Sequence, residues 1–236
     1  MKIAVLLSGN GVYDGSEIHE AVATLLALNR LNVETICVAP NIEQHHVLNH
    51  LTGAEMPEKR NVLVEAARIA RGNIKSLEEV SAADFDALAM PGGFGVAKNF
   101  TKWAFKGAAG EIDEAIKNFI HGFLNANKPI AAVCMSPTVL AKVLEGTDKK
   151  AKLTVGNLEQ ASPYDIGAIS QQMELIGSQA VMCDKDDVVF DDENNIVTCP
   201  CYMMEASIVD IFNGIEKTMN KLVEMTTLYK EAQEIQ

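Results

Sequence analysis

Short apolar runs alternate with amphipathic stretches over roughly the first 145 residues. The apolar runs predict strands at 2–8, 33–39, 85–90 and 130–133, and a helix capped by Ser16 follows the first of them. Apolar residues recur at helical spacing in two stretches: Ile18, Val22, Leu25, Leu26 and Leu28, mostly on one face, and then Ile112, Ile116, Phe119, Ile120, Phe123 and Leu124. Strands that alternate with helices form a parallel sheet with helices on both faces, so the pattern predicts an α/β fold.

The pattern changes after about residue 150. Short apolar segments at 181–183, 188–190 and 196–199 predict further strands. The polar residues 191–195 predict the turn of an antiparallel hairpin at one edge of the sheet. An amphipathic helix from about residue 204 to 225 is expected to close the domain.

The chain shows no internal repeat and no clear linker. We therefore expect a single domain over residues 1–225, followed by a polar C-terminal tail over 226–236. Residues 41–83 are too long for a plain connection, and they contain three histidines and a predicted helix over 62–70. Loops of this length usually carry structure of their own, so an inserted helical segment that covers a site or an interface is expected there.

Charge and hydropathy restrict the classes of partner. The 236 residues include 32 acidic and 20 basic side chains, a net charge of −12. This balance argues against nucleic acid or an anionic membrane surface as the main partner. No apolar run approaches the ~20 residues that cross a bilayer. The apolar run at residues 2–7 is followed by Gly9 and then by acidic residues, so it is too short for a signal peptide. The sequence therefore predicts a cytoplasmic protein.

Five cysteines stand at positions 37, 134, 183, 199 and 201. An odd number without a secretory signal predicts reduced thiols. Cys199 and Cys201 form the one close pair, and no further metal ligands stand at suitable spacing, so neither a metal nor a cofactor is expected.

The most informative thiol is Cys134, at the junction of a strand and a helix. Ser136 is a suitable cap and Pro137 suits the first helical position. A thiol at such a corner faces the amide dipoles of the new helix, which favours thiolate and reactivity. The pattern alone equally allows Cys134 to be a small buried residue at the end of a core strand.

Two other loops leave strand ends that should lie at the same edge of the sheet, where ligands bind in open parallel sheets. The first loop, 8–17, contributes Asn10 as a candidate substrate-binding residue and Glu17 as a candidate acid/base. The second contributes Gly92 and Gly93, whose amides could form an oxyanion hole together with that of Met135. The plainer interpretations are a tight turn for the glycines and a helix-dipole interaction for Glu17.

Four segments, taken together, resemble a known family: Ser8 to Glu20, Asn61 to Gly72, Met90 to Asn99, and Ala132 to Met135. In order, over roughly residues 1–225, they are similar to the ElbB family, named for enhanced lycopene biosynthesis and part of the ThiJ/PfpI superfamily. The resemblance implies a flavodoxin-like three-layer sandwich shared with class I glutamine amidotransferases. It also implies that Cys134 is the nucleophile at the strand-to-helix turn and that Glu17 is its carboxyl partner. Because members of the superfamily commonly form dimers, the resemblance further implies a homodimer. Some family members are described as having glyoxalase activity.

The chain departs from related families at two positions. Met135 stands where many PfpI-type proteins have a histidine after the nucleophile. Class I amidotransferases have His-Pro-Glu near the end of a late strand, whereas residues 198–201 read Thr-Cys-Pro-Cys. A glutaminase or a Cys-His-acid hydrolase is therefore disfavoured.

Two hypotheses remain open. The first is a glyoxalase III-like lyase that converts small 2-oxoaldehydes such as methylglyoxal to 2-hydroxy acids without glutathione. Cys134 would form a hemithioacetal and Glu17 would be the general acid/base, with a small carbonyl compound as the only partner besides a second copy of the chain. The second is a non-catalytic stress or redox-sensing module, or a metabolite-binding one, linked to isoprenoid metabolism.

Overall fold

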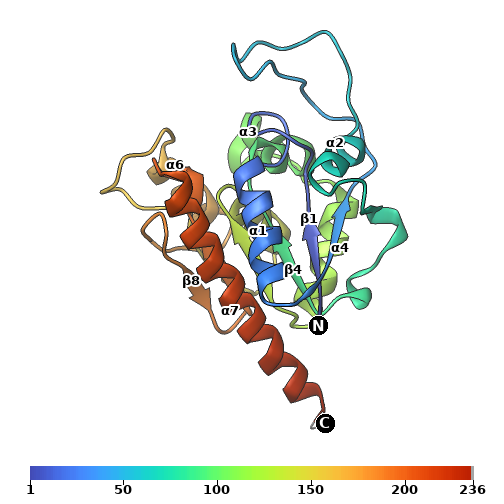
Figure 1. The fold of residues 1–236 in the computed structure, drawn as a ribbon. Coiled ribbons are helices and arrows are strands. Elements are labelled where there is room, and N and C mark those ends of the chain that lie inside the picture. The colour runs from blue at the N-terminus through green and yellow to red at the C-terminus, as the bar shows by residue number, and fades with distance from the viewer. Residues whose placement is uncertain (235–236) are drawn as a thin grey trace.

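The computed structural model describes residues 1–234 and is built around one seven-stranded sheet in the order β3-β2-β1-β4-β5-β9-β8 (Figure 1). Its strands are β1 (Lys2–Leu6), β2 (Glu34–Ala39), β3 (Ile74–Ser76), β4 (Ala87–Met90), β5 (Ile130–Val133), β8 (Val189–Asp191) and β9 (Ile196–Cys199). All neighbours pair in parallel except β8 and β9, which are antiparallel. The predicted α/β fold with one antiparallel edge hairpin is confirmed. A separate parallel pair consists of β6 (Lys152–Leu153) and β7 (Gln179–Ala180).

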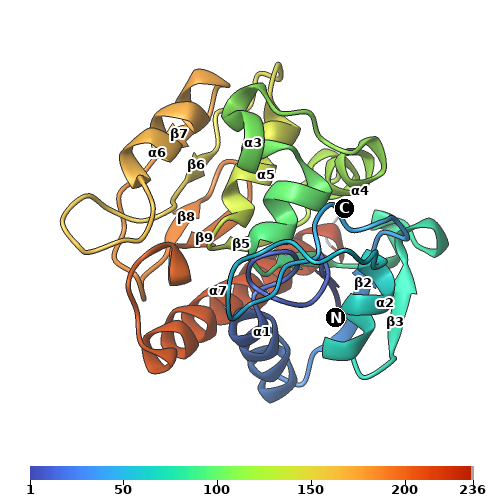
Figure 2. The ribbon, with the colours of Figure 1, turned by 90° about the horizontal axis from the view of Figure 1, so that it is seen from above.

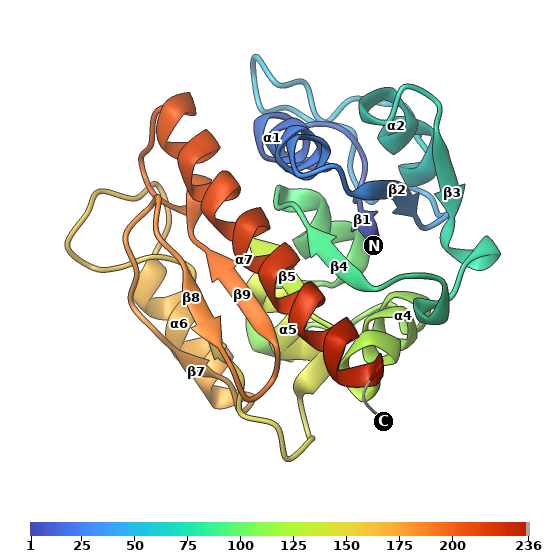
Figure 3. The same cartoon turned by 60° about the horizontal axis from the view of Figure 1, so that its bottom comes forward.

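Helices cover both faces of the sheet, as the views from above and below show (Figures 2 and 3). They are α1 (Ile18–Arg30), α2 (Val62–Ile69), α3 (Trp103–Lys106), α4 (Glu114–Asn125), α5 (Ser136–Leu144), α6 (Ile166–Leu175) and α7 (Ile208–Glu234). The pair α1 and α7 lies on one face and the pair α4 and α5 on the other. The central strands β4 and β5 are buried along their whole length, because helices exclude water from both of their faces.

The burial of α1 differs from the prediction. Ile18, Val22 and Leu26, which were expected to face the core, are 44%, 49% and 40% exposed. The core-facing side instead carries Glu20 and small residues such as Ala27. Small side chains let α1 approach the sheet and α7 closely, so the helix is rotated away from its larger apolar stripe.

Three further elements differ from the sequence prediction. Residues 181–183 are not a strand, because the short strand β7 ends before them. Helix α7 begins at Ile208 rather than near 204 and runs on to Glu234, through most of the expected tail; Ile235 and Gln236 lie outside the described residues. Helix α6 was not predicted at all, because its apolar periodicity is weak.

The segment 41–83 contains the predicted helix, α2, and also the edge strand β3. Its first half is a long loop that projects beyond the end of the sheet (Figure 1). That loop packs on the loop after β1, since the Leu48 amide donates to the Asp14 carboxylate at 2.7 Å. In residues 1–234 no helix is both long and apolar enough to cross a membrane.

Candidate active site

Three loops meet where β1, β4 and β5 end, because these strands are neighbours in the sheet. The loops after β1 and β4 are joined through their backbones. The Glu17 amide donates to the Gly92 carbonyl at 3.0 Å, and the Gly95 amide donates to the Gly15 carbonyl at 2.8 Å. The edge predicted from the sequence is therefore assembled as one site.

Cys134 lies at the tight corner between β5 and α5. Its φ is +57°, in the left-handed region that non-glycine residues rarely adopt. Two hydrogen bonds hold the corner: the Cys134 amide donates to the Cys199 carbonyl at 2.9 Å, and Ser136 Oγ donates to the Pro91 carbonyl at 2.7 Å. The thiol is 6% exposed, so it lies at the floor of the site rather than on the surface.

The carboxyl that contacts this thiol belongs to Glu20, on the buried side of α1. Its Oε2 accepts from the Gly92 amide at 3.0 Å, and its Oε1 accepts from the Tyr202 amide at 3.3 Å. A Cβ added at Gly92 would lie 2.7 Å from Glu20 Oε2, 2.4 Å from Cys134 Cβ and 2.9 Å from Cys134 Sγ. A glycine is therefore required at position 92 for the carboxyl and the thiol to meet.

Burial controls the protonation of this pair. Burial and then the neighbouring Glu17 charge together raise the pKa of Glu20 to about 8, against hydrogen bonds that lower it. Burial and then the Glu20 charge raise the pKa of the Cys134 thiol well above its usual range, while the amides of Gly93 and Met135 act in the opposite direction. The helix-start amides thus act as expected, but desolvation outweighs them and the resting form is the thiol rather than the thiolate.

Glu17 occupies a different place from Glu20. It is the N-cap of α1, and its Oε2 accepts from the Glu20 amide at 2.7 Å. The residue is 7% exposed, and burial raises the pKa of its carboxyl. Glu17 lines the open cavity of the site, whereas Glu20 contacts the sulfur.

The three amides predicted to form the oxyanion hole do not all contact the same group. The Gly92 amide is occupied by Glu20, whereas the amides of Gly93 and Met135 face the Cys134 sulfur. Gly93 has φ +98°, and a Cβ there would lie 2.4 Å from the Glu17 nitrogen. Asn10, the predicted substrate-binding residue, lies near the start of the first loop, with its backbone nitrogen against Gly15.

A cavity of about 710 Å³ opens beside Glu17. Its lining is mostly aromatic and apolar: Val12, Tyr13, Glu17, His19, Phe94, Pro163, Tyr164, Tyr202, Met204, Glu205 and Ala206. Burial, followed by the charges of Cys134 and Glu20, raises the pKa of Tyr164 in this wall to about 12.

Sequence reasoning missed four residues here: Glu20, Tyr164, Cys201 and Tyr202. The sequence did contain a signal for Glu20. This charged residue stands one helical turn after Glu17, on the same helix face as alanines that are buried in the structure. Cys201 is fully buried with its Sγ 3.5 Å from Cys199 Sγ, and burial and then the contact with Cys199 raise the pKa of its thiol, with smaller contributions from the Glu20 and Cys134 charges. Tyr164 lies in a loop and Tyr202 in a single 3-10 turn, Cys201–Met203, and neither segment has a periodic pattern.

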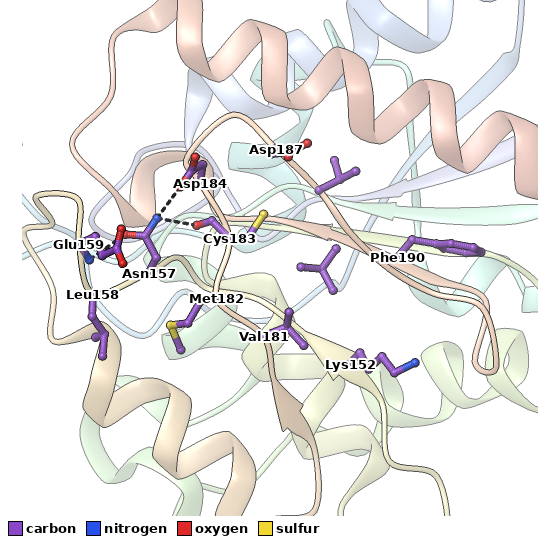
Figure 4. Close-up of a pocket in the computed structure, with 12 residues that line it drawn as sticks. Lys152, Asn157, Leu158, Glu159, Val181, Met182, Cys183, Asp184, Asp187 and Phe190 are labelled. Atoms are coloured by element: carbon purple, nitrogen blue, oxygen red, sulfur yellow. Dashed lines mark hydrogen bonds between the residues drawn. The ribbon is translucent and has the colours of Figure 1, made fainter.

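A second cavity, of about 750 Å³, lies beside β7 and β8 (Figure 4). Asn157 Nδ2 donates there to the Cys183 carbonyl at 3.1 Å and to Asp184 Oδ1 at 2.9 Å. None of the site residues predicted from the sequence lines this cavity. Within residues 1–234, no group of three or more potential ligands is arranged to hold a metal ion.

Comparison with known proteins identifies the family of this chain. The model of the DJ-1/PfpI family matches residues 1–199. A rat protein named ES1 protein homolog, mitochondrial, is 37% identical over 227 residues, which cover 95% of this chain and 84% of the relative. The human glutamine amidotransferase-like class 1 domain-containing protein 3, mitochondrial, is likewise 37% identical, with 95% and 83% covered.

A solved structure extends the comparison. The isoprenoid biosynthesis protein with amidotransferase-like domain from Ehrlichia chaffeensis superposes with a TM-score of 0.86 at 38% identity, over 95% of this chain and 99% of that one. The superfamily and the flavodoxin-like fold implied by the sequence resemblance are confirmed. The predicted cytoplasmic location is overturned, because the rat and human relatives are both named as mitochondrial.

Proposed function

The chain belongs to the DJ-1/PfpI family, and we propose that within it this protein is a glyoxalase-type enzyme for 2-oxoaldehydes. The observation that carries the proposal is the buried Cys134–Glu20 contact beside a cavity lined by Glu17. A nucleophile, two carboxyls with raised pKa values and two amide donors make up the inventory that this chemistry needs.

The reaction begins when the Cys134 sulfur bonds to the aldehyde carbon. The carbonyl electron pair takes up a proton, which gives a hemithioacetal. Removal of the proton from that carbon gives an enediol, and protonation of the neighbouring carbon then gives the thioester of a 2-hydroxy acid. Water adds to the thioester, and the sulfur leaves with a proton. The aldehyde carbon is oxidised and the ketone carbon is reduced, so the balance requires water and no external oxidant.

The two carboxyls have separate roles in this proposal. The ionised form of Glu20, which is the minor form at neutral pH because the pKa is about 8, accepts the thiol proton as the carbon–sulfur bond forms, since this carboxyl contacts the sulfur. Glu17 lines the cavity and shuttles the proton between the two carbons. The amides of Gly93 and Met135 stabilise the developing alkoxide, since they are the donors that face the sulfur.

The test is conversion of methylglyoxal to lactate by the purified protein, with lactate measured by a coupled dehydrogenase. Cys134→Ala should abolish turnover, and Glu17→Gln should lower kcat by about 10²–10⁴-fold because an amide cannot exchange a proton. Cys183→Ser and Glu174→Gln are the matched controls and should retain activity, since neither residue lines the cavity. Wild-type turnover by Glu17→Gln would refute the role of Glu17.

The raised thiol pKa favours one alternative, a module that binds a metabolite or is oxidised without turnover. A thiol kept protonated at neutral pH reacts slowly with electrophiles. Absence of lactate formation, together with saturable binding of the oxoaldehyde at Cys134 seen by mass spectrometry, would favour that alternative.

A further inference from the structure

We propose that the cavity beside Cys134 selects substrates whose remaining part is flat, apolar and either uncharged or positively charged, and that it excludes anionic ones. The inference rests on the proposed function only for the reactive carbonyl group. The charge preference follows from the residues of the cavity and is tested without turnover.

The walls of the cavity are suited to flat apolar groups. Phe94 and Tyr164 stand edge to face with ring centroids 5.8 Å apart, and the Tyr202 hydroxyl lies 2.8 Å from His19 Nδ1. Aromatic faces bind apolar groups and also attract cations. The volume of about 710 Å³ is within the ~300–1,000 Å³ typical of small-molecule sites, and methylglyoxal would leave most of it empty.

Carboxyls outnumber the side chains that can carry a positive charge in the lining of the cavity, where His19 is the one such side chain among the described residues. Among the described residues that line it, Glu17 and Glu205 carry carboxyls and none is a lysine or an arginine. Lys98 does not itself line the cavity: its ammonium lies 5.2 Å from the centroid of the Phe94 ring and donates to the Tyr13 carbonyl at 2.7 Å, and the residue is 9% exposed. The charge of His19 acts to lower the pKa of Glu17, against the larger effect of burial, so repulsion of an anionic group in this space comes chiefly from Glu205.

The start of α1 adds to this preference. A helix N-terminus ordinarily attracts anions through its free amides. Here the Glu17 side chain accepts from the Glu20 amide at 2.7 Å, so the protein's own carboxyl occupies that position. The cavity therefore lacks the feature by which many sites hold phosphate or carboxylate groups.

The cavity lies next to the thiol, although Cys134 is not one of its lining residues: a Cβ at Gly92 would lie 2.9 Å from Cys134 Sγ, and one at Gly93 would lie 2.4 Å from the nitrogen of Glu17, which lines the cavity. Phe94 follows Gly93, whose amide faces the sulfur, and the charge on Cys134 contributes to the raised pKa of Tyr164. A reagent that approaches Cys134 through this cavity meets its lining, which includes the aromatic rings and Glu205.

The experiment compares how fast three methanethiosulfonates modify Cys134, at 0.15 M salt, in protein whose other cysteines are replaced by serine or alanine. The reagents carry a trimethylammonium, a methyl or a sulfonate group, and each rate is divided by its rate with the urea-unfolded protein. We expect the cationic reagent to exceed the anionic one by about tenfold, the effect of one or two carboxylates within ~7 Å at intermediate dielectric. Glu205→Gln should lower that ratio several-fold, and Glu205→Lys should reverse it.

The matched control is Glu174→Gln, which changes the net charge equally at an exposed site outside the cavity. Its ratio should equal that of the wild type. A ratio near one, an equal change in Glu174→Gln and Glu205→Gln, or no modification of Cys134 by any reagent would each overturn the proposal.

The rate of substrate conversion tests the same selectivity in a second way. With phenylglyoxal, methylglyoxal and 4-carboxyphenylglyoxal as substrates, kcat/KM should be highest for phenylglyoxal and at least tenfold lower for its carboxylated analogue. Equal values for the two aromatic substrates would contradict the proposed selectivity. If none is converted, the proposed function fails, while the modification ratios still decide the charge preference.

Discussion

Replacing Glu20 with Gln should change how the stability of the protein depends on pH. The Glu20 carboxyl has a pKa of about 8 in the folded protein, against an ordinary 4.5. Between these values the folded state binds a proton that the unfolded state has lost, so the free energy of unfolding falls as the pH rises. The loss is about 1.4 kcal/mol per pH unit in the middle of the window, or about 2 kcal/mol from pH 6 to pH 7.5.

Gln cannot ionise, so Glu20→Gln should remove this slope. The variant also loses one of the two acceptors that meet the Gly92 and Tyr202 amides, which costs about 1–3 kcal/mol at every pH. The constant offset and the slope can be separated by urea unfolding at several pH values from 5.5 to 8.5. Glu174→Gln, an exposed site on α6, serves as the control and should keep the wild-type slope. If Glu20→Gln and wild type give parallel curves, Glu20 does not hold a proton in the folded protein and the account of the thiol pair is wrong.

Other expectations follow from the same site. Cys134→Gly should be more stable than Cys134→Ala by about 1 kcal/mol in urea, because φ is +57° at this position; equal stability would contradict backbone strain at the corner. Gly92→Ala should lose activity and about 1–3 kcal/mol of unfolding free energy, since the new Cβ would lie 2.4 Å from Cys134 Cβ; a crystal structure with an undisturbed thiol would argue against this. At pH 8.5, Glu20→Gln should speed alkylation of Cys134, because it removes a charge that raises the thiol pKa, and slower labelling would oppose this view. We expect a homodimer, since Ile18, Val22 and Leu26 expose an apolar stripe on α1; light scattering that gives the 25.6 kDa mass of one chain at micromolar concentration would count against it.

The position of the candidate site follows from the sequence because strand ends in a parallel sheet share one edge. Cys134, Gly93 and Met135 each follow a run that reads as a buried strand, and they meet as expected. The individual role of Glu20 could not be predicted, because Glu17 and Glu20 both lie at the start of one helix.

Which of the two carboxyls reaches the sulfur depends on how α1 is rotated about its axis. The apolar pattern indicated a rotation that buries Val22, whereas the structure buries Glu20. One error therefore explains both the misplaced helix face and the missed carboxyl. The walls of the cavity were beyond sequence reasoning for another reason: Tyr164 lies in an irregular segment and Tyr202 in a single 3-10 turn, Cys201–Met203, and neither has an apolar periodicity that predicts its position.

The hydrogen bonds that enclose Cys134 come from parts of the chain that are synthesised at very different times. The Cys199 carbonyl and the Tyr202 amide are made long after Glu20 and Cys134, and β9 completes the parallel part of the sheet. On the ribosome, the thiol must therefore emerge before the segment that encloses it, with the ordinary reactivity of an unfolded cysteine. The nascent chain is thus most vulnerable to electrophiles and oxidants in the interval before residues 196–202 leave the exit tunnel, so slow elongation over that interval would damage the same thiol that the finished fold protects.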